Sequence, residues 1–159
     1  MVFWDQVFHE TGKQYPEVKT SSCLVDAASM FMVRQPSRFQ VVVTSNLFGD
    51  ILTDLGAAIA GGMGLAAGAN LNPERKYPSM FEPIHGSAPD IAGQNKANPM
   101  AAVWAVSQML DFLGYENWAM RLIEIIEEIL VEGDVLPEDL GGHAGTSQVG
   151  DEIVRKLIL

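Results

Sequence analysis

The sequence contains little cysteine, few basic residues and no long apolar run. Cys23 is the only cysteine among the 159 residues, so no disulfide can form within the chain, and the sequence predicts a cytoplasmic protein. The 20 acidic residues outnumber the 10 basic ones and give a formal charge of −10, which disfavours binding to nucleic acid and to anionic membranes. No stretch approaches the roughly 20 apolar residues of a membrane span. The first residues also lack the pattern of a signal peptide.

Hydrophobic residues make up 48% of the chain, enough for the core of an ordinary globular domain. Apolar residues recur at helical spacing in several segments, and Asn98 and Thr146 are typical residues for helix starts. Glutamates 124, 127, 128 and 132 fall between the apolar positions of one helix and are expected to face solvent. Helices are predicted over 2–14, 26–34, 46–59, 98–113, 117–132 and 146–158.

Two β-prone runs alternate with these helices and predict an α/β fold. Residues 20–25 form a short candidate strand, and residues 40–45 form a nearly continuous apolar run typical of a strand covered on both faces of a parallel sheet. The glycines between 61 and 64 predict a hinge or domain crossing. Residues 65–93 are dense in Gly, Pro, Asn and Ser and are expected to be mostly loop, a length that is usually functional.

Asp50 and Asp54 are four residues apart, so a helix places both carboxylates on one face. No Lys or Arg lies between Phe39 and Arg75 to offset their charges, whereas a hard divalent cation would. Asp26, at a strand-to-helix junction, could complete an all-oxygen site of the Mg²⁺ or Mn²⁺ type. The alternative is that Asp50 lies near a helix N-terminus, where its charge interacts favourably with the helix dipole, and that Asp54 is merely exposed.

The loop from Glu82 to Asp90 places small residues around a histidine and an aspartate, so its backbone N–H groups could approach a phosphate closely. It matches no general nucleotide-binding motif. His85 could equally be a hydrogen-bonded structural residue, Asp90 a turn residue, and Asn98 only a helix cap. One cysteine and three scattered histidines provide no zinc site, and no G-x-S-x-G nucleophile motif is present.

Four segments resemble, in order, the isocitrate and isopropylmalate dehydrogenase family, and the resemblance covers nearly the whole chain. An additional stretch, Asn70–Arg75, looks most like the tartrate/D-malate dehydrogenase branch of that family. The four segments are Val25–Ala27, Val42–Asp54, Phe81–Gly93 and Ala97–Pro99.

The resemblance implies a metal- and NAD(P)-dependent oxidation of 2-hydroxy acids, commonly followed by β-decarboxylation. It makes Asp26, Asp50 and Asp54 the carboxylates that hold Mg²⁺ or Mn²⁺, which binds the substrate hydroxyl and adjacent carboxylate and acts as a Lewis acid. Relatives are homodimers in which the first aspartate reaches the partner's site, so Asp26 is expected to act in trans. Their first half also supplies a catalytic lysine, a tyrosine and substrate-gripping arginines, and these have no counterpart in the 159 residues.

The resemblance further implies that the loop from His85 to Asp90 binds adenosine. The loop residues implied are His85, Gly86, Ser87, Ala88 and Asp90, with Asn98 near the adenine and Glu82 towards the nicotinamide. Asp90 would accept hydrogen bonds from the ribose diol and repel a 2′-phosphate, which favours NAD; NADP-using relatives have Lys-Tyr in place of Asp90-Ile91.

We therefore expect the C-terminal half of a homodimeric, NAD- and divalent-metal-dependent dehydrogenase with a two-domain, doubly wound isopropylmalate-dehydrogenase-like α/β fold. Residues 1–61 would belong to the substrate and dimerisation domain, and residues 62–159 to the nucleotide-binding domain. The expected substrate is a small 2-hydroxy acid, tartrate or D-malate, with 3-isopropylmalate as the alternative. A non-catalytic module that keeps the metal and nucleotide contacts is the alternative of another class. The chain alone is expected to be inactive.

Overall fold

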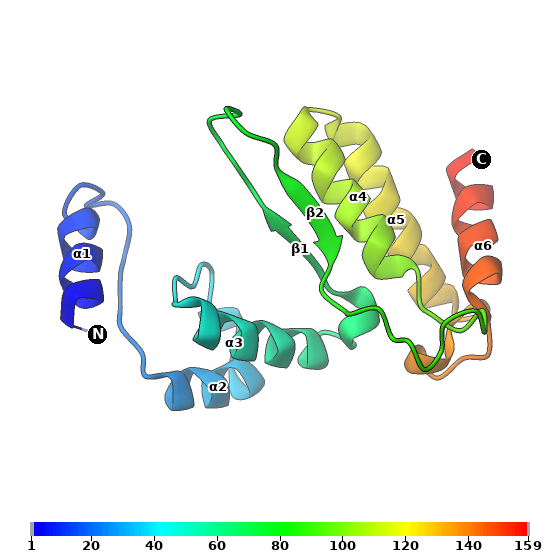
Figure 1. Cartoon of the computed structure of the whole chain (residues 1–159), viewed down its shortest axis with the longest axis horizontal. Helices are drawn as coiled ribbons and strands as arrows, with labels where there is room; N and C mark the ends of the chain where they lie inside the picture. Colours follow the sequence, from blue (N-terminus) through cyan, green and yellow to red (C-terminus); the bar gives the residue numbers. More distant parts are fainter. Residues whose placement is uncertain (1, 159) are drawn as a thin grey trace.

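A computed structural model of the chain describes residues 2–158. Helix α1 (Val2–Gly12) lies apart at one end of the molecule, and a long extended segment connects it to α2 (Val25–Arg34) (Figure 1). A short 3₁₀ turn (Pro36–Arg38) follows, and α3 (Asn46–Ile59) packs against α2. All three helices were predicted, and their bounds agree with the periodicity within two residues.

The second part of the chain forms layers around α4 (Met100–Leu113). An antiparallel ribbon of β1 (Ala67–Asn70) and β2 (Met80–Pro83) covers one side of α4, and α5 (Glu116–Glu132) packs on another (Figure 1). Helix α6 (Thr146–Ile158) then packs against α5. Short 3₁₀ turns precede β1 (Met63–Leu65) and α6 (Glu138–Leu140).

The main hydrophobic core lies between these C-terminal helices. Met100 and Ile125 are fully buried, and Ile129 is 1% exposed. Of the buried apolar residues, only Ala28, Leu52 and Ala57 come from the three N-terminal helices, within the part of the chain that the structure describes. The core cluster comprises Leu65, Met100, Ile125, Ile126, Ile129, Val149 and Ile153.

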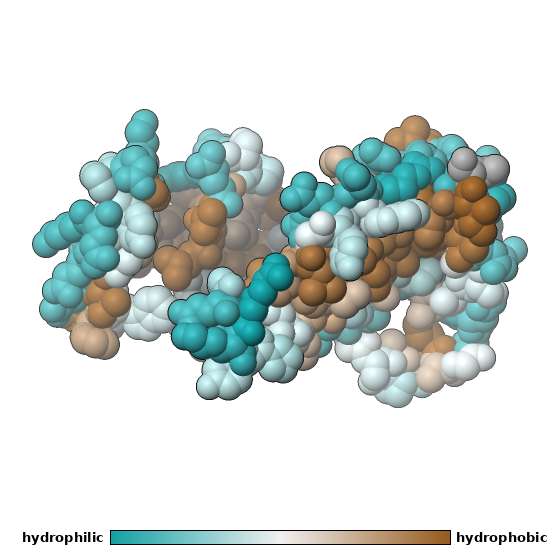
Figure 2. Space-filling model, turned by 90° about the horizontal axis from the view of Figure 1, so that it is seen from above, coloured by the Kyte–Doolittle hydropathy of each residue, from teal (hydrophilic) through white to brown (hydrophobic). Residues whose placement is uncertain are grey.

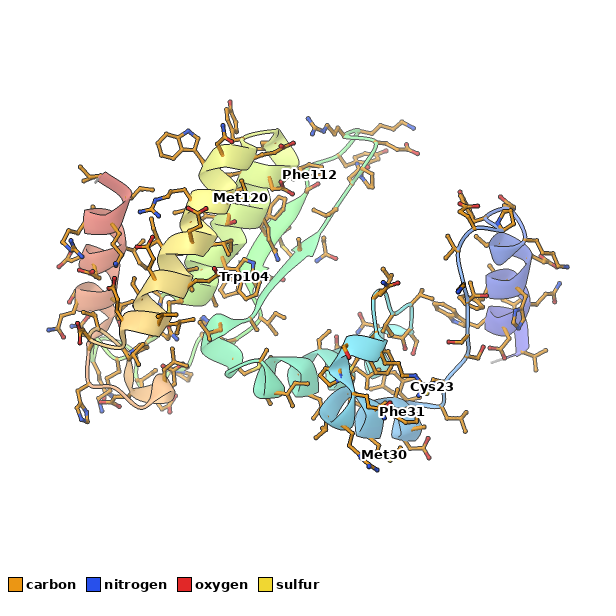
Figure 3. The ribbon with its side chains drawn as sticks, turned by 180° about the vertical axis from the view of Figure 1, so that it is seen from behind. Cys23, Met30, Phe31, Trp104, Phe112 and Met120 are labelled. Carbon is orange, nitrogen blue, oxygen red and sulfur yellow. The ribbon has the colours of Figure 1, made fainter. Side chains whose placement is uncertain are left out.

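Hydrophobic side chains remain on the surface of the N-terminal part. Val2 and Phe3 of α1 are 83% and 76% exposed, and brown surface appears in both halves of the molecule in Figure 2. The lone Cys23 is free and exposed on the segment leading into α2 (Figure 3). Isolated exposed apolar residues are normal, but here they recur along every N-terminal element.

The two predicted strands at 20–25 and 40–45 are wrong for this chain. Residues 20–24 and 41–45 are coil, and the described sheet contains only β1 and β2. Val41 and Val43 are 92% and 62% exposed rather than covered on both faces. A strand needs a neighbour to pair its N–H and C=O groups, and neither segment has one among residues 2–158.

The prediction that residues 65–93 are mostly loop missed the β1–β2 ribbon. Ala67 pairs with Pro83 and Asn70 with Met80. Phe112 lies near the end of α4 (Figure 3). The tip of the ribbon is attached there, because the Arg75 guanidinium donates to the Phe112 carbonyl and lies 4.9 Å from the centre of the Phe112 ring. Phe81 also packs on Phe112, with ring centres 5.9 Å apart. The ribbon is therefore held against α4, and this contact fixes where the loop that follows β2 begins.

The α5 face predicted to be solvated also binds α6. Glu124, Glu127 and Glu132 are exposed as predicted, and Glu128 is partly buried. Glu128 and Glu132 also accept hydrogen bonds from Lys156 Nζ at 3.1 and 2.7 Å, and the Lys156 side chain is only 7% exposed. The partner lies in a helix more than 20 residues further along the chain, so the periodicity of α5 alone could not indicate this role.

Candidate functional site

Two predicted metal ligands lie on one face of α3. Asp50 and Asp54 occupy positions i and i+4 of the helix, and both residues are exposed. The Asp50 Oδ2 atom accepts a hydrogen bond from Asn46 Nδ2 at 3.0 Å. No salt bridge among the described residues neutralises either carboxylate. Their remaining oxygen atoms are thus open to an external cation.

The third predicted ligand, Asp26, lies in the first turn of α2. Its Oδ1 atom accepts a hydrogen bond from the Ala27 backbone N–H at 2.8 Å, and the residue is exposed. Helices α2 and α3 pack together, yet residues 2–158 contain no group of three His, Cys, Asp or Glu side chains close enough to hold one ion. Asp26 does not join Asp50 and Asp54 within a single copy of the chain. Its proposed role in trans stays a prediction.

The predicted nucleotide loop begins where β2 ends. Glu82 lies on β2 opposite Gly68 and is exposed. His85 is half-buried, and its Nδ1 lies 3.1 Å from the Gly86 carbonyl oxygen. The following residues, Gly86, Ser87, Ala88, Pro89 and Asp90, are all exposed. These residues therefore present backbone and side-chain groups to solvent.

Ala88 has a φ of +42°, a left-handed conformation that is uncommon for alanine. Backbone strain of this kind is often found where a loop is shaped for a ligand. The turn is held locally, because the Ile91 N–H donates to the Ala88 carbonyl at 3.1 Å and Gln94 Nε2 donates to the Asp90 carbonyl at 2.7 Å. The Asp90 carboxylate makes no hydrogen bond or salt bridge within the described part of the chain and is free to accept one.

Asn98 binds the start of α4, as expected of a capping residue, but the N-cap position itself is Pro99. Its Oδ1 atom accepts a hydrogen bond from the Met100 N–H at 2.9 Å, at the start of α4. Its Nδ2 atom donates to Asp139 Oδ2 at 3.0 Å, and the residue is 8% exposed. These two bonds engage both ends of the side-chain amide. A contact between Asn98 and adenine stays a prediction, and it would rely on the groups that these bonds leave free.

Sequence reasoning missed the residues that fix the far end of the loop. Asn95 accepts and donates hydrogen bonds to the start of α6, and Asp139 binds the Asn98 amide. Thr146 was expected to cap α6, but its hydroxyl donates to the Ala97 carbonyl at 2.6 Å, and this expectation is wrong. An Asn next to Gly-rich sequence was a local signal for a turn. Its partner, 52 residues further along, had no local signal.

An open depression of about 620 Å³ lies between the end of α5 and the start of α6, bordered by His143, Asp151 and Arg155. None of the predicted site residues borders it. The candidate site therefore lies outside this depression. It consists of two exposed surfaces, which are the aspartates of α2 and α3 and the loop after β2. No helix among residues 2–158 is long and apolar enough to cross a membrane.

Comparison with known proteins accounts for this arrangement. The family described as isocitrate/isopropylmalate dehydrogenase matches residues 1–153. A 3-isopropylmalate dehydrogenase of Thermobifida fusca is 54% identical over 154 residues, which cover 97% of this chain and 42% of that protein. A probable tartrate dehydrogenase/decarboxylase of Bacillus subtilis is 47% identical over 157 residues, which cover 99% of this chain and 44% of that protein.

Solved structures show the same likeness. An isocitrate dehydrogenase from Methylococcus capsulatus superposes with a TM-score of 0.90 and 42% identity, over 97% of this chain and 45% of that structure. This chain thus spans less than half the length of the proteins that it matches.

Proposed function

Because the chain belongs to the isocitrate/isopropylmalate dehydrogenase family and folds as part of its α/β fold, we propose that it is the C-terminal portion of an NAD- and divalent-metal-dependent dehydrogenase of 2-hydroxy acids. The reaction proposed is oxidation of the hydroxyl followed by loss of CO₂. D-malate dehydrogenase of Escherichia coli, whose name specifies a decarboxylating enzyme, is 48% identical over 164 aligned residues. One observation carries the proposal: the carboxylates that match the family motif are exposed on α2 and α3, and no cationic side chain among residues 2–158 forms a salt bridge with them.

The residues of α2 and α3 fit a hard divalent cation. Carboxylate oxygens are the ligands that Mg²⁺ and Mn²⁺ prefer, and Asp50 and Asp54 present theirs from one helix face. We propose that Asp26 completes the set from a second copy of the chain, which would require a homodimer. When bound, the ion supplies Lewis-acid polarisation of the substrate oxygens. The protein's part is to hold the carboxylates in place, and hydrogen bonds from the Ala27 N–H to Asp26 and from Asn46 Nδ2 to Asp50 do this.

The loop after β2 fits the adenosine half of NAD. Its exposed Gly86, Ser87 and Ala88 leave backbone groups accessible to a phosphate, and the exposed Asp90 carboxylate can accept hydrogen bonds from a ribose diol. The same carboxylate would repel a 2′-phosphate, so we propose NAD rather than NADP. NAD supplies the hydride acceptor, and Glu82, on β2, is proposed to lie towards the nicotinamide.

We propose tartrate or D-malate as the substrate, on the resemblance of Asn70–Arg75 to that branch. The alternative is 3-isopropylmalate, which the 54% identical relative supports. The residues that grip the substrate and transfer its proton belong, by family resemblance, to sequence preceding these 159 residues. A cytoplasmic location is proposed from the single cysteine and the metabolic relatives.

The test is NADH formation at 340 nm by the full-length enzyme, with Mn²⁺, NAD and each of tartrate, D-malate and 3-isopropylmalate. Turnover with at least one acid is expected, and the acid with the largest kcat/KM identifies the substrate. Absence of turnover with all three, together with intact Mn²⁺ and NAD binding, would instead indicate the non-catalytic module.

The 159-residue chain alone is expected to show no turnover. General acid–base catalysis contributes typically about 10²–10⁴-fold, and substrate orientation contributes several kcal/mol more. Both are assigned to residues outside this chain. Turnover within tenfold of the full-length enzyme would show that a complete site exists in these residues.

A further inference from the structure

The loop between β2 and α4 is attached to the rest of the chain at its two ends. At its start, the Ile84 N–H donates to the Ala66 carbonyl at 3.0 Å, which continues the β1–β2 ladder. At its end, Asn95 meets the start of α6. Between them, Gly86–Asp90 are exposed, and their hydrogen bonds within the described residues are local to the loop. The position of the loop is therefore determined mainly by these two attachments.

Asn95 makes three hydrogen bonds to the first turn of α6. Its carbonyl accepts from the Thr146 N–H at 2.9 Å, its Oδ1 accepts from the Ser147 N–H at 2.9 Å, and its Nδ2 donates to the Ser147 hydroxyl at 2.9 Å. The Thr146 hydroxyl adds a fourth hydrogen bond between α6 and the end of this loop, because it donates to the Ala97 carbonyl. Asn95 thus caps α6 from outside the helix, where the first N–H groups lack partners within the helix itself.

The backbone at both sides of this contact suits only a few residue types. Asn95 has a φ of +57°, which asparagine and glycine tolerate better than other residues. A Cβ on Gly145 would lie 2.5 Å from Asn95 Nδ2 and 2.8 Å from its carbonyl oxygen, so the close approach requires glycine. Both residues are thus matched to the contact.

A chain of turns connects Asn95 with the exposed part of the loop. The Gln94 N–H donates to the Ile91 carbonyl at 3.1 Å, and the Ile91 N–H donates to the Ala88 carbonyl at 3.1 Å. Gln94 Nε2 also holds the Asp90 carbonyl at 2.7 Å. Displacement of Asn95 would therefore move Ala88 and Asp90 as well.

We propose that Asn95 is a positioning residue, which fixes the nucleotide loop against α6 and so sets the affinity for the cofactor. The effect on affinity rests on the proposed function of the loop as an NAD site. The mechanical coupling between α6 and the loop does not. No part of the inference requires Asn95 to touch the cofactor.

The test compares Asn95→Gly, Asn95→Asp and wild type in the full-length enzyme by hydrogen exchange and by NAD titration. Glycine keeps the left-handed backbone but removes both side-chain bonds. Amides of residues 146–149 and 86–93 are expected to exchange at least threefold faster, and NAD to bind at least fivefold more weakly. Aspartate retains the acceptor for the Ser147 N–H and can accept a hydrogen bond from the Ser147 hydroxyl. Asn95→Asp is therefore expected to show exchange rates like those of wild type and an NAD affinity within twofold of wild type.

Asn72→Gly is the matched control, because Asn72 Nδ2 holds the Tyr77 carbonyl at 3.2 Å in the β1–β2 connection, away from α6. It should leave exchange in 86–93 and NAD affinity unchanged. If Asn95→Gly does not fold, Ser147→Ala removes one of the three bonds and should give a smaller change in the same direction.

Two results would overturn the proposal: faster exchange in 146–149 with no change in 86–93, or unchanged NAD affinity in Asn95→Gly. If the wild-type full-length enzyme does not bind NAD at all, the assignment of the loop as a cofactor site fails. Exchange in 86–93 then still decides whether Asn95 holds the loop.

Discussion

The Lys156 Nζ atom lies 2.7 Å from Glu132 Oε1 and 3.1 Å from Glu128 Oε2, which ties the last turns of α6 to α5. Arg121 extends this network, since it donates to Glu128 Oε1 at 2.7 Å and to the Lys156 carbonyl at 2.9 Å. Hydrogen bonds from Arg121 and then Lys156 hold the pKa of Glu128 below its ordinary value of 4.5. The hydrogen bonds that Lys156 donates to Glu132 and Glu128 raise the pKa of Lys156 above its ordinary value.

The first prediction follows from these shifts. A carboxylate with a depressed pKa in the folded state stabilises the fold above its unfolded pKa, and this contribution is lost as the pH falls through the folded pKa. The contribution of Lys156, whose pKa is raised, is lost only in strongly alkaline solution. Glu128→Gln should therefore destabilise the chain at pH 7 and have a smaller effect at pH 3. Urea unfolding at both pH values measures this, and an equal loss at both would contradict it.

A pair of glycine substitutions tests the packing at the α6 entry. A Cβ on Gly142 would lie 2.0 Å from the Leu136 carbonyl oxygen, which accepts the Ala144 N–H. Gly142→Ala should cost about 2 kcal/mol or more, because overpacking and a broken hydrogen bond combine. Gly150→Ala is the control, since nothing lies within 4 Å of its Cβ position in α6. It should stabilise by about 0.5–1 kcal/mol through helix propensity. Thermal unfolding of the two variants should shift in opposite directions.

The third prediction concerns the cation. Asp54→Asn removes one of two carboxylates on the same face of α3 and should weaken Mn²⁺ binding at least tenfold in the full-length enzyme. Titration calorimetry measures the affinity directly. Asp151→Asn, an exposed aspartate on α6, is the control and should bind Mn²⁺ as wild type does. Unchanged affinity in Asp54→Asn would remove that residue from the site.

The fourth prediction concerns the choice of cofactor. Asp90→Ala removes an acceptor for the ribose diol and a charge that repels a 2′-phosphate. In the full-length enzyme, Asp90→Ala should weaken NAD binding and reduce the preference for NAD over NADP. The ratio of the two dissociation constants measures this preference. An equal loss for both cofactors would argue against this role for Asp90.

The helices could be predicted from the sequence because their signals are local. Asn98 and Gly114 bracket α4, and Gly133 ends α5 in the left-handed conformation that favours glycine. The ribbon was missed because Ala67–Asn70 contains no β-branched residue. The connection to Met80–Pro83 is also too long for a tight hairpin turn, so no turn motif indicated the pairing. The strand predicted at 40–45 is wrong for the opposite reason, since its residues favour a strand but the described part of the chain offers no neighbouring strand to pair with it.

The candidate site divides in the same way. The spacing of Asp50 and Asp54 on α3 follows from the sequence, because a helix fixes which residues share a face. The contacts of Asn95 with Ser147, and of Glu132 with Lys156, depend on tertiary packing between distant segments. No local pattern indicates such partners.

The coil segment 40–45 has a consequence for handling the protein. It is uncharged, free of proline and rich in β-branched residues, and Val41 and Val43 are 92% and 62% exposed. Unpaired N–H and C=O groups along such a segment are a template for intermolecular β-pairing, which is the first step of aggregation. A preparation of the 159-residue chain should therefore precipitate with a strong dependence on concentration. A charged residue in place of Val41, whose side chain already faces water, should delay precipitation without disturbing the core formed by α4, α5 and α6.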